Sequence, residues 1–198
     1  QSMFGLSGQS SASNNTAVGY QSLYTNTTGS GLTAVGYGAL KLNTSGSENT
    51  AIGRNALDAN TTGASNTAVG RDSLGANTTA SFNSAFGFNA LKANTTGANN
   101  TAVGEGAMEV NIGGSFNTAM GVSALDANTT GADNVALGTY SLSANTTAGK
   151  NTAVGRSSLS ANITGAQNVA VGYASLEANT TGFENVAVGS IALDANTT

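Results

Sequence analysis

The sequence predicts an all-β protein: a parallel β-solenoid, in which short coils stack along one axis. Three features support this prediction: an uninterrupted 17-residue repeat, many small and turn-forming residues, and large apolar residues confined to a few places in each repeat. We expect eleven 17-residue coils over residues 15–198, the last one incomplete. Residues 1–14 break the pattern and are expected to form an N-terminal cap or docking segment.

The repeat is clearest in the segment Asn-Thr-Ala-Val-Gly, which begins at Asn15 and returns every 17 residues. Its glycine recurs from Gly19 to Gly189 without an insertion, and the unit reads N-T-A-V-G-x-x-A-L-x-A-N-T-T-G-x-x. A helical hairpin repeat needs about 30 residues or more, so this shorter unit fits one β coil, which we expect to hold two short strands. The Asn-Thr-Thr-Gly segment has the chemistry of a turn. Residues related by the repeat form a column, named after its first member.

The composition narrows the possible functions. Charged residues make up 8% of the chain, compared with about 25% in a typical globular domain. His and Cys are absent, so the common zinc, copper and haem ligand sets and the cysteine and serine–histidine nucleophiles cannot be assembled. We therefore expect no enzyme and no cofactor. The net charge of −4 and the lack of a long apolar run argue against nucleic-acid partners and membrane insertion.

Two columns are predicted to form the core, because they hold the large apolar residues. The Val18 column varies among Val, Ile, Phe, Met and Leu, whereas the Leu23 column is Leu throughout except for Met108. All charged residues fall in four other columns, which must face water because burying an unpaired charge is costly. Those columns are headed by Tyr20, Gln21, Tyr24 and Gly31. The predicted core residues are Val18, Val35, Ile52, Val69, Phe86, Val103, Leu23, Leu40, Leu57, Leu74 and Leu91.

The Ala17 column is alanine in all eleven coils. Neighbouring residues of a strand point to opposite faces, so Ala17 and Val18 cannot both point into one narrow coil. Because neither column carries a charge, we expect both faces of the strand to be covered, the alanine face by other copies of the chain. The Gly19 column would permit the same close approach; the alternative is that the alanines occupy a tight bend. The predicted self-association face is Ala17, Ala34, Ala51, Ala68, Ala85, Ala102, Ala119, Ala136, Ala153, Ala170 and Ala187.

The Asn26 column is asparagine in every coil, and Asn15 recurs in all coils except the one that begins at Leu32. Stacked identical amides can bond from coil to coil, so we predict an asparagine ladder. Most members of the Asn26 column also lie in N-x-[ST] sequons, so glycosylation is the alternative. The predicted ladder is Asn26, Asn43, Asn60, Asn77, Asn94, Asn111, Asn128, Asn145, Asn162, Asn179 and Asn196.

The motif N-T-A-V-G-x-x-A-L-x-x-N-T-T-G resembles two sets of proteins: the head domains of trimeric autotransporter adhesins, and the 17-residue arrays of large bacterial and viral fibre proteins. The coils that begin at Asn134, Asn168 and Asn185 are most similar to the adhesin pattern. The resemblance covers residues 15–198 and implies a single-stack, left-handed parallel β-roll in a homotrimer. The adhesin coils are shorter than the 17 residues found here.

The repeat and the resemblance together favour a structural extracellular fibre or filament segment, at a cell surface or on a virion or phage fibre. Its expected partner is itself, as a homotrimer or a head-to-tail filament. Residues Met3–Leu6 are predicted to form a degenerate strand within the cap. The sequence stops at Thr198 in mid-coil, so we expect either a continuation or an open end that stacks on another subunit.

Two other functions remain open. One is an adhesin or phage or virus receptor-binding fibre module that contacts a host-surface receptor or a glycan. Tyr20, Tyr37, Phe88 and Tyr173 share a column that could form an aromatic ligand patch, although Arg54, Arg71 and Glu105 interrupt it and a solvated face is the favoured interpretation. The other is an ice-binding β-solenoid, because Asn and Thr recur in register, although Gly113 interrupts the Thr28 column.

Overall fold

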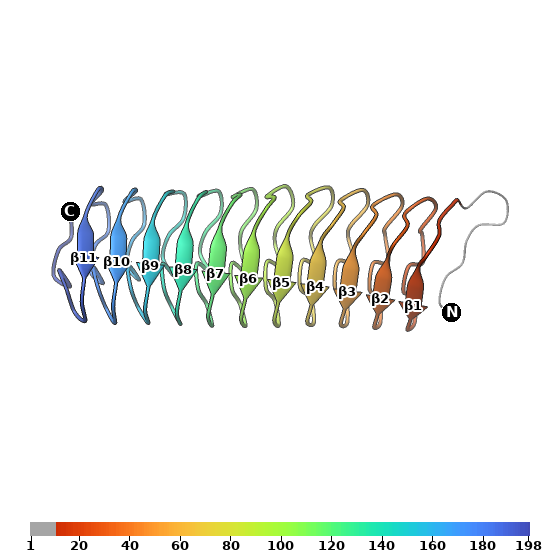
Figure 1. Cartoon of the computed structure of the whole chain (residues 1–198), viewed down its shortest axis with the longest axis horizontal. Helices are drawn as coiled ribbons and strands as arrows, with labels where there is room; N and C mark the ends of the chain where they lie inside the picture. The colour runs from red at the N-terminus through yellow and green to blue at the C-terminus, as the bar shows by residue number, and fades with distance from the viewer. Residues whose placement is uncertain (1–10) are drawn as a thin grey trace.

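The computed structural model describes residues 11–198, which form one straight stack of coils (Figure 1). Each coil contributes one three-residue strand at the same place in the repeat, and no helix occurs within residues 11–198. The prediction of an all-β parallel solenoid is therefore confirmed. The strands are β1 (Thr16–Val18), β2 (Thr33–Val35), β3 (Thr50–Ile52), β4 (Thr67–Val69), β5 (Ser84–Phe86), β6 (Thr101–Val103), β7 (Thr118–Met120), β8 (Val135–Leu137), β9 (Thr152–Val154), β10 (Val169–Val171) and β11 (Val186–Val188).

The eleven strands form one parallel sheet in sequence order, so each strand pairs with those of the coils before and after it. The register follows the repeat: Ala17 pairs with Ala34, and Val18 pairs with Val35. Identical or similar residues therefore lie above one another along the whole sheet. Ser13 already follows this register, because its N–H bonds to Ser30 Oγ at 3.1 Å, 17 residues further on. The predicted strand Met3–Leu6 lies outside the described residues.

The prediction of two strands per coil is wrong, because the chain between one strand and the next consists of turns and irregular structure. The Leu23 column adopts a left-handed backbone, with φ between 49° and 55°. A leucine at positive φ costs on the order of 1 kcal/mol or more, and it ends any strand. Burial of the side chain and stacking of the backbone offset this cost: Leu40 is fully buried, and its N–H donates to Ala56 O at 3.1 Å.

The two faces of the strand are the reverse of the prediction. Ala102 lies inside the coil and is 0% exposed, whereas Val18 is 57% exposed and Phe86 41%. The Leu23 column, fully buried from Leu23 to Leu176, already fills the narrow interior, so only a methyl group fits under the strand beside it. Alternation then places the larger neighbours outside. The residues wrongly assigned to the core are Val18, Val35, Ile52, Val69, Phe86 and Val103. The alanines wrongly assigned to an exposed self-association face are Ala17, Ala34, Ala51, Ala68, Ala85, Ala102, Ala119, Ala136, Ala153, Ala170 and Ala187.

The Leu23 column, by contrast, forms the core as predicted. Leu23, Leu40, Leu57, Leu74 and Leu91 are each 0% exposed and pack in one continuous cluster with the alanines. Each coil thus buries one large side chain and several small ones. Because the core is this thin, the coil-to-coil hydrogen bonds contribute much to specifying the fold.

The Gly19 column provides a close approach between coils of one chain, not between chains. Gly87 has φ +139°, and a Cβ added there would lie against the carbonyl group of Gly104 in the next coil. An L-residue would face both the clash and the unfavourable φ. This explains why every coil has glycine at this position.

Candidate self-association face

One side of each coil carries an extended strip in which every second residue is exposed or half-buried. Along residues 82–88 the intervening Asn83 and Ala85 are buried, as the alternation of extended chain requires. The accessible residues are Phe82, Ser84, Phe86 and Phe88. The outer face is defined as the four columns that these residues represent. A rung is the seven-residue stretch that crosses the outer face once, such as 82–88. The four columns are headed by Gly31, Thr16, Val18 and Tyr20.

The outer face is large enough to form a stable interface. Six residue steps of at most about 3.3 Å make it up to about 20 Å wide, and stacked strands at about 4.8 Å make it about 50 Å long. An area of up to about 1,000 Å² is comparable to the roughly 800 Å² that each partner contributes to a standard protein–protein interface.

The centre of the outer face is free of charge and its edges are not. The Thr16 column holds only Thr, Ser and Val, and the Val18 column holds only apolar residues. The two edges, the Gly31 and Tyr20 columns, carry both acidic and basic residues. An apolar centre within a polar rim is the usual anatomy of a protein interface. That the strand is covered on both sides stays a prediction, and the Val18 column, not the alanine column, is the side that another molecule would cover.

Two rungs of the outer face are much bulkier than the others. Rung 82–88 carries three phenylalanines, and rung 116–122 carries Phe, Met and Val. Exposed large apolar side chains gathered in one place mark interaction sites more often than isolated ones do. Their exposed fractions are 62% for Phe82, 41% for Phe86, 40% for Phe88, 62% for Phe116, 45% for Met120 and 42% for Val122.

The asparagine ladder is present and continuous. Asn94 Nδ2 donates to Asn77 Oδ1 at 3.2 Å and to Gly97 O at 2.9 Å, and Asn94 Oδ1 accepts from Asn111 Nδ2 at 2.8 Å. Ladder bonds of this kind join every neighbouring pair of the column from Asn26 to Asn196. From Asn43 to Asn179 the side chains are fully buried, so glycosylation of these asparagines is contradicted.

The Asn15 column forms a second line of amides beside the first. Asn49 Oδ1 accepts the backbone N–H of Asn66 at 2.9 Å, and Asn49 Nδ2 donates to Gly63 O at 2.7 Å. The same Gly63 carbonyl also accepts from Asn60 at 3.0 Å, so both asparagine columns converge on it. Both columns satisfy buried backbone groups and are structural.

The aromatic residues of the Tyr20 column do not form one patch. The rings of Tyr20 and Tyr37 stack with centroids 5.4 Å apart. Phe88 instead lies under the guanidinium group of Arg71, which is 5.3 Å from the ring centroid. Intervening residues separate both groups from Tyr173. The predicted aromatic ligand patch is therefore split into separate parts.

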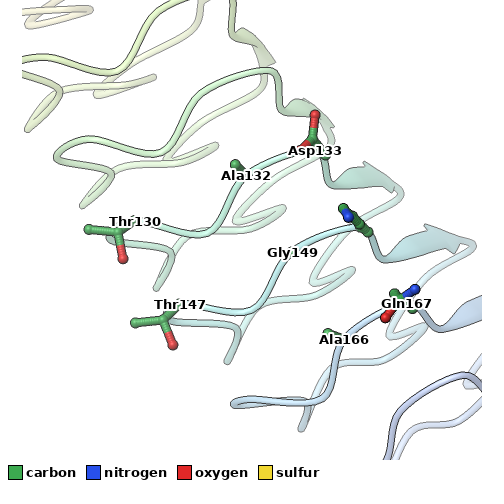
Figure 2. A pocket seen from close by; sticks show the side chains of 8 residues that line it. Thr130, Ala132, Asp133, Thr147, Gly149, Ala166 and Gln167 are labelled. Atoms are coloured by element: carbon green, nitrogen blue, oxygen red, sulfur yellow. The ribbon is translucent and has the colours of Figure 1, made fainter.

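A shallow groove of about 390 Å³ runs beside one edge of the outer face. Figure 2 shows Thr130 and Thr147 along one side of it, and Asp133 and Gln167 on the other side, next to the strands. Small residues, including Gly149, lie between them. The lining offers hydroxyl, amide and charged groups with hydrogen-bonding capacity, but no convergent set of catalytic residues.

Two carboxyl groups away from the outer face have raised pKa values. Burial raises the pKa of Asp58, and the nearby Asp72 adds to the effect. Burial likewise raises the pKa of Asp126, with a smaller contribution from Glu109. Such a carboxyl contributes fully to stability below its ordinary pKa of 3.8, and the contribution is lost as the pH rises through the raised value.

Replacing Asp126 by asparagine is accordingly expected to stabilise the fold at about pH 7 by less than about 1 kcal/mol, because the group is only half-buried. At about pH 3 the gain should vanish, since the aspartate is then protonated. Urea unfolding at both pH values measures the difference, and Asp133→Asn, at an exposed position, is the matched control. A loss of stability at neutral pH would contradict the assignment.

Within residues 11–198, no group of three or more His, Cys, Asp or Glu side chains is placed to hold a metal ion. In the same residues no helix is long and apolar enough to span a membrane. Comparison with models of known protein families, with curated proteins and with solved structures found no match to this chain. The structure thus defines a class, a parallel β-solenoid of 17-residue repeats, and no more specific family.

Proposed function

We propose that the chain is a structural segment of an extracellular fibre, and that copies of it associate side by side through the outer face. The observation that carries this proposal is the charge-free Val18 column, with the bulky rungs 82–88 and 116–122 at its middle. Strand pairing gives the straight sheet a regular spacing of about 4.8 Å. Another surface with the same spacing matches it best. A second copy of the chain provides one.

The sequence motif supports a more particular form of the proposal. The coils that begin at Asn134, Asn168 and Asn185 resemble those of trimeric adhesin heads, and the 17-residue unit resembles arrays of bacterial and viral fibres. We therefore propose a homotrimer, displayed at a cell surface or on a virion or phage fibre. A structural rather than an enzymatic role agrees with charged side chains that are spread over many coils instead of being gathered in one.

The proposal predicts that Phe86→Glu separates the copies without unfolding them. Phe86 is 41% exposed in the single chain, so glutamate is tolerated there, but it would place a charge in the middle of the interface. Light scattering should report a monomer, and circular dichroism should be unchanged. Thr96→Glu, at an exposed position outside the outer face, is the matched control and should leave the oligomer intact. If Phe86→Glu keeps the size of the unaltered chain, the outer face is not the interface.

A receptor-binding module is the second candidate, and the groove beside Thr130 and Thr147 favours it. Its hydroxyl, amide and charged groups suit a polar ligand such as a glycan. Screening the unaltered chain against a set of immobilised glycans tests this function, and Lys150→Ala should reduce any binding that the groove provides. Binding that the variant leaves unchanged would not belong to the groove.

A further inference from the structure

Each rung of the outer face has two ends that cannot touch within one chain. One end belongs to the Gly31 column and the other to the Tyr20 column, as Phe82 and Phe88 do in rung 82–88. Three of the seven residues of a rung form a strand that runs between the ends, and the rung spans up to about 20 Å. Among the described residues the one aromatic ring pair is Tyr20–Tyr37, so Phe82 and Phe88 are not in ring contact. If the residues at the two ends of a rung are matched in character, contact between them within one chain therefore cannot be the reason.

The two ends are nevertheless matched in apolar character. In the Gly31 column the apolar side chains are Phe82 and Phe116, and in the Tyr20 column those without a polar group are Phe88 and Val122. They occupy the same two rungs, 82–88 and 116–122. All four are exposed, by 40% to 62%. No other rung has such a residue at either end.

The charges are compatible with contact between the two ends of a rung, with one exception. Rung 48–54 has Glu48 at one end and Arg54 at the other. In rungs 65–71, 99–105, 133–139 and 184–190, a charged end lies opposite an uncharged polar one. Rung 150–156 is the exception, with Lys and Arg at its ends, although Asp133 lies one coil away in the same column as the lysine. Figure 2 shows Asp133 near the strands at this edge.

We propose that neighbouring copies lie parallel and in register around an axis parallel to the rod, so that the Gly31-column edge of one copy faces the Tyr20-column edge of the next. This inference rests on the proposed self-association and names its geometry. Rotation about such an axis brings opposite edges together at equal height, which is where the matched residues lie. Phe82 of one copy then covers Phe88 of the next, and Glu48 of one copy faces Arg54 of the next.

An antiparallel arrangement fits the charges less well. A two-fold axis through the middle rung, 99–105, also brings the two bulky rungs together. It pairs each edge with itself, so Glu48 faces Lys150 favourably. However, Arg54 then faces Arg156 and Glu105 faces its own copy, which makes two like-charge contacts against the single Lys150–Arg156 contact of the parallel arrangement. Like charges directly opposite each other are unfavourable, so the parallel arrangement is preferred.

Cysteine cross-linking distinguishes the two arrangements, because the chain contains no native cysteine. The sites are the ends of the middle rung, changed singly as Asn99→Cys and Glu105→Cys. Both positions are exposed, and the left-handed backbone of Asn99 (φ 58°) is shared by Phe82 and Gln167 in the same column, so a cysteine is accommodated. The double variant cannot close a bond within one chain, because a disulfide requires Cα atoms within about 7 Å.

A mixture of the two single variants is expected to form disulfide-linked dimers, whereas each variant alone stays unlinked. The double variant should form closed rings, and their size on a denaturing gel gives the number of copies. Asn99→Cys mixed with Thr96→Cys is the control and should not cross-link. Disulfides formed by Asn99→Cys alone would establish the antiparallel arrangement and overturn the inference. If the unaltered chain is oligomeric but the mixed single variants form no cross-link, the inference is overturned too, while self-association is left in place. A monomeric unaltered chain would instead refute the proposed function.

Discussion

Replacing Ala102 by leucine is expected to destabilise folding of the chain itself by about 3 kcal/mol, the upper part of the range for overpacked cores. Ala102 is 0% exposed and belongs to the same buried cluster as the leucines of the Leu23 column. Neighbouring coils hold identical alanines in register, so the added atoms cannot expand along the axis without displacing paired strands. Thermal or urea unfolding, followed by circular dichroism, measures the effect.

The matched control for this change is Val103→Leu, one residue further on. Val103 is half-buried on the outer face, and Leu137 occupies the same column. The control is therefore expected to change the stability of the single chain by no more than about 0.5 kcal/mol. If Ala102→Leu left stability unchanged and dissociated the copies, the alanines would line the interface and the described orientation of the strand would be wrong.

The second large effect is expected from Asn94→Asp. The new carboxylate would be buried against two carbonyl oxygens, Asn77 Oδ1 and Gly97 O, to which the asparagine amide now donates. Breaking a buried polar network so that it leaves an uncompensated charge costs about 3–5 kcal/mol. Because each coil contacts only its neighbours, the loss should begin as local opening of the coils next to this one.

The pH dependence of this variant provides an independent check. Burial and the facing carbonyls should raise the pKa of the introduced carboxyl, so the penalty is present above the raised pKa and is relieved as the pH falls through it. Asn99→Asp is the control: the position is exposed, and Asp133 occurs naturally in its column. Urea unfolding at several pH values separates the two variants. Equal stability of both would show that the ladder bonds contribute little.

The repeat was sufficient to predict the stacking direction, the register and the ladder, because identical residues at a fixed interval can align in parallel in one way. It did not show which face of the strand is inside. Alternation places Ala17 and Val18 on opposite faces but leaves the choice open, and the apolar content of the Val18 column was the wrong guide. The uniformity of the Ala17 column was the better guide. A column restricted to alanine lies where space is limiting, whereas a column that accepts Val, Phe and Met lies where it is not.

The absence of a second strand and the matched rung ends could not be predicted for related reasons. A positive φ at leucine is unfavourable locally and occurs because the surrounding coils enforce it. No local sequence pattern therefore predicts it. Phe82 and Phe88 fall in columns that appear unrelated until the structure places both on the outer face. The sequence shows that both residues are large and apolar, and the fold shows that they lie on one surface.

Hydroxyl-radical footprinting of the unaltered chain tests most directly whether other copies cover the outer face. In the single chain Phe82 and Phe116 are each 62% exposed, and Phe183, which lies outside the outer face, is 68% exposed. Three side chains of the same kind and similar exposure should react at similar rates unless something covers them. Our account predicts that Phe82 and Phe116 are oxidised much more slowly than Phe183. Equal rates for all three would contradict it.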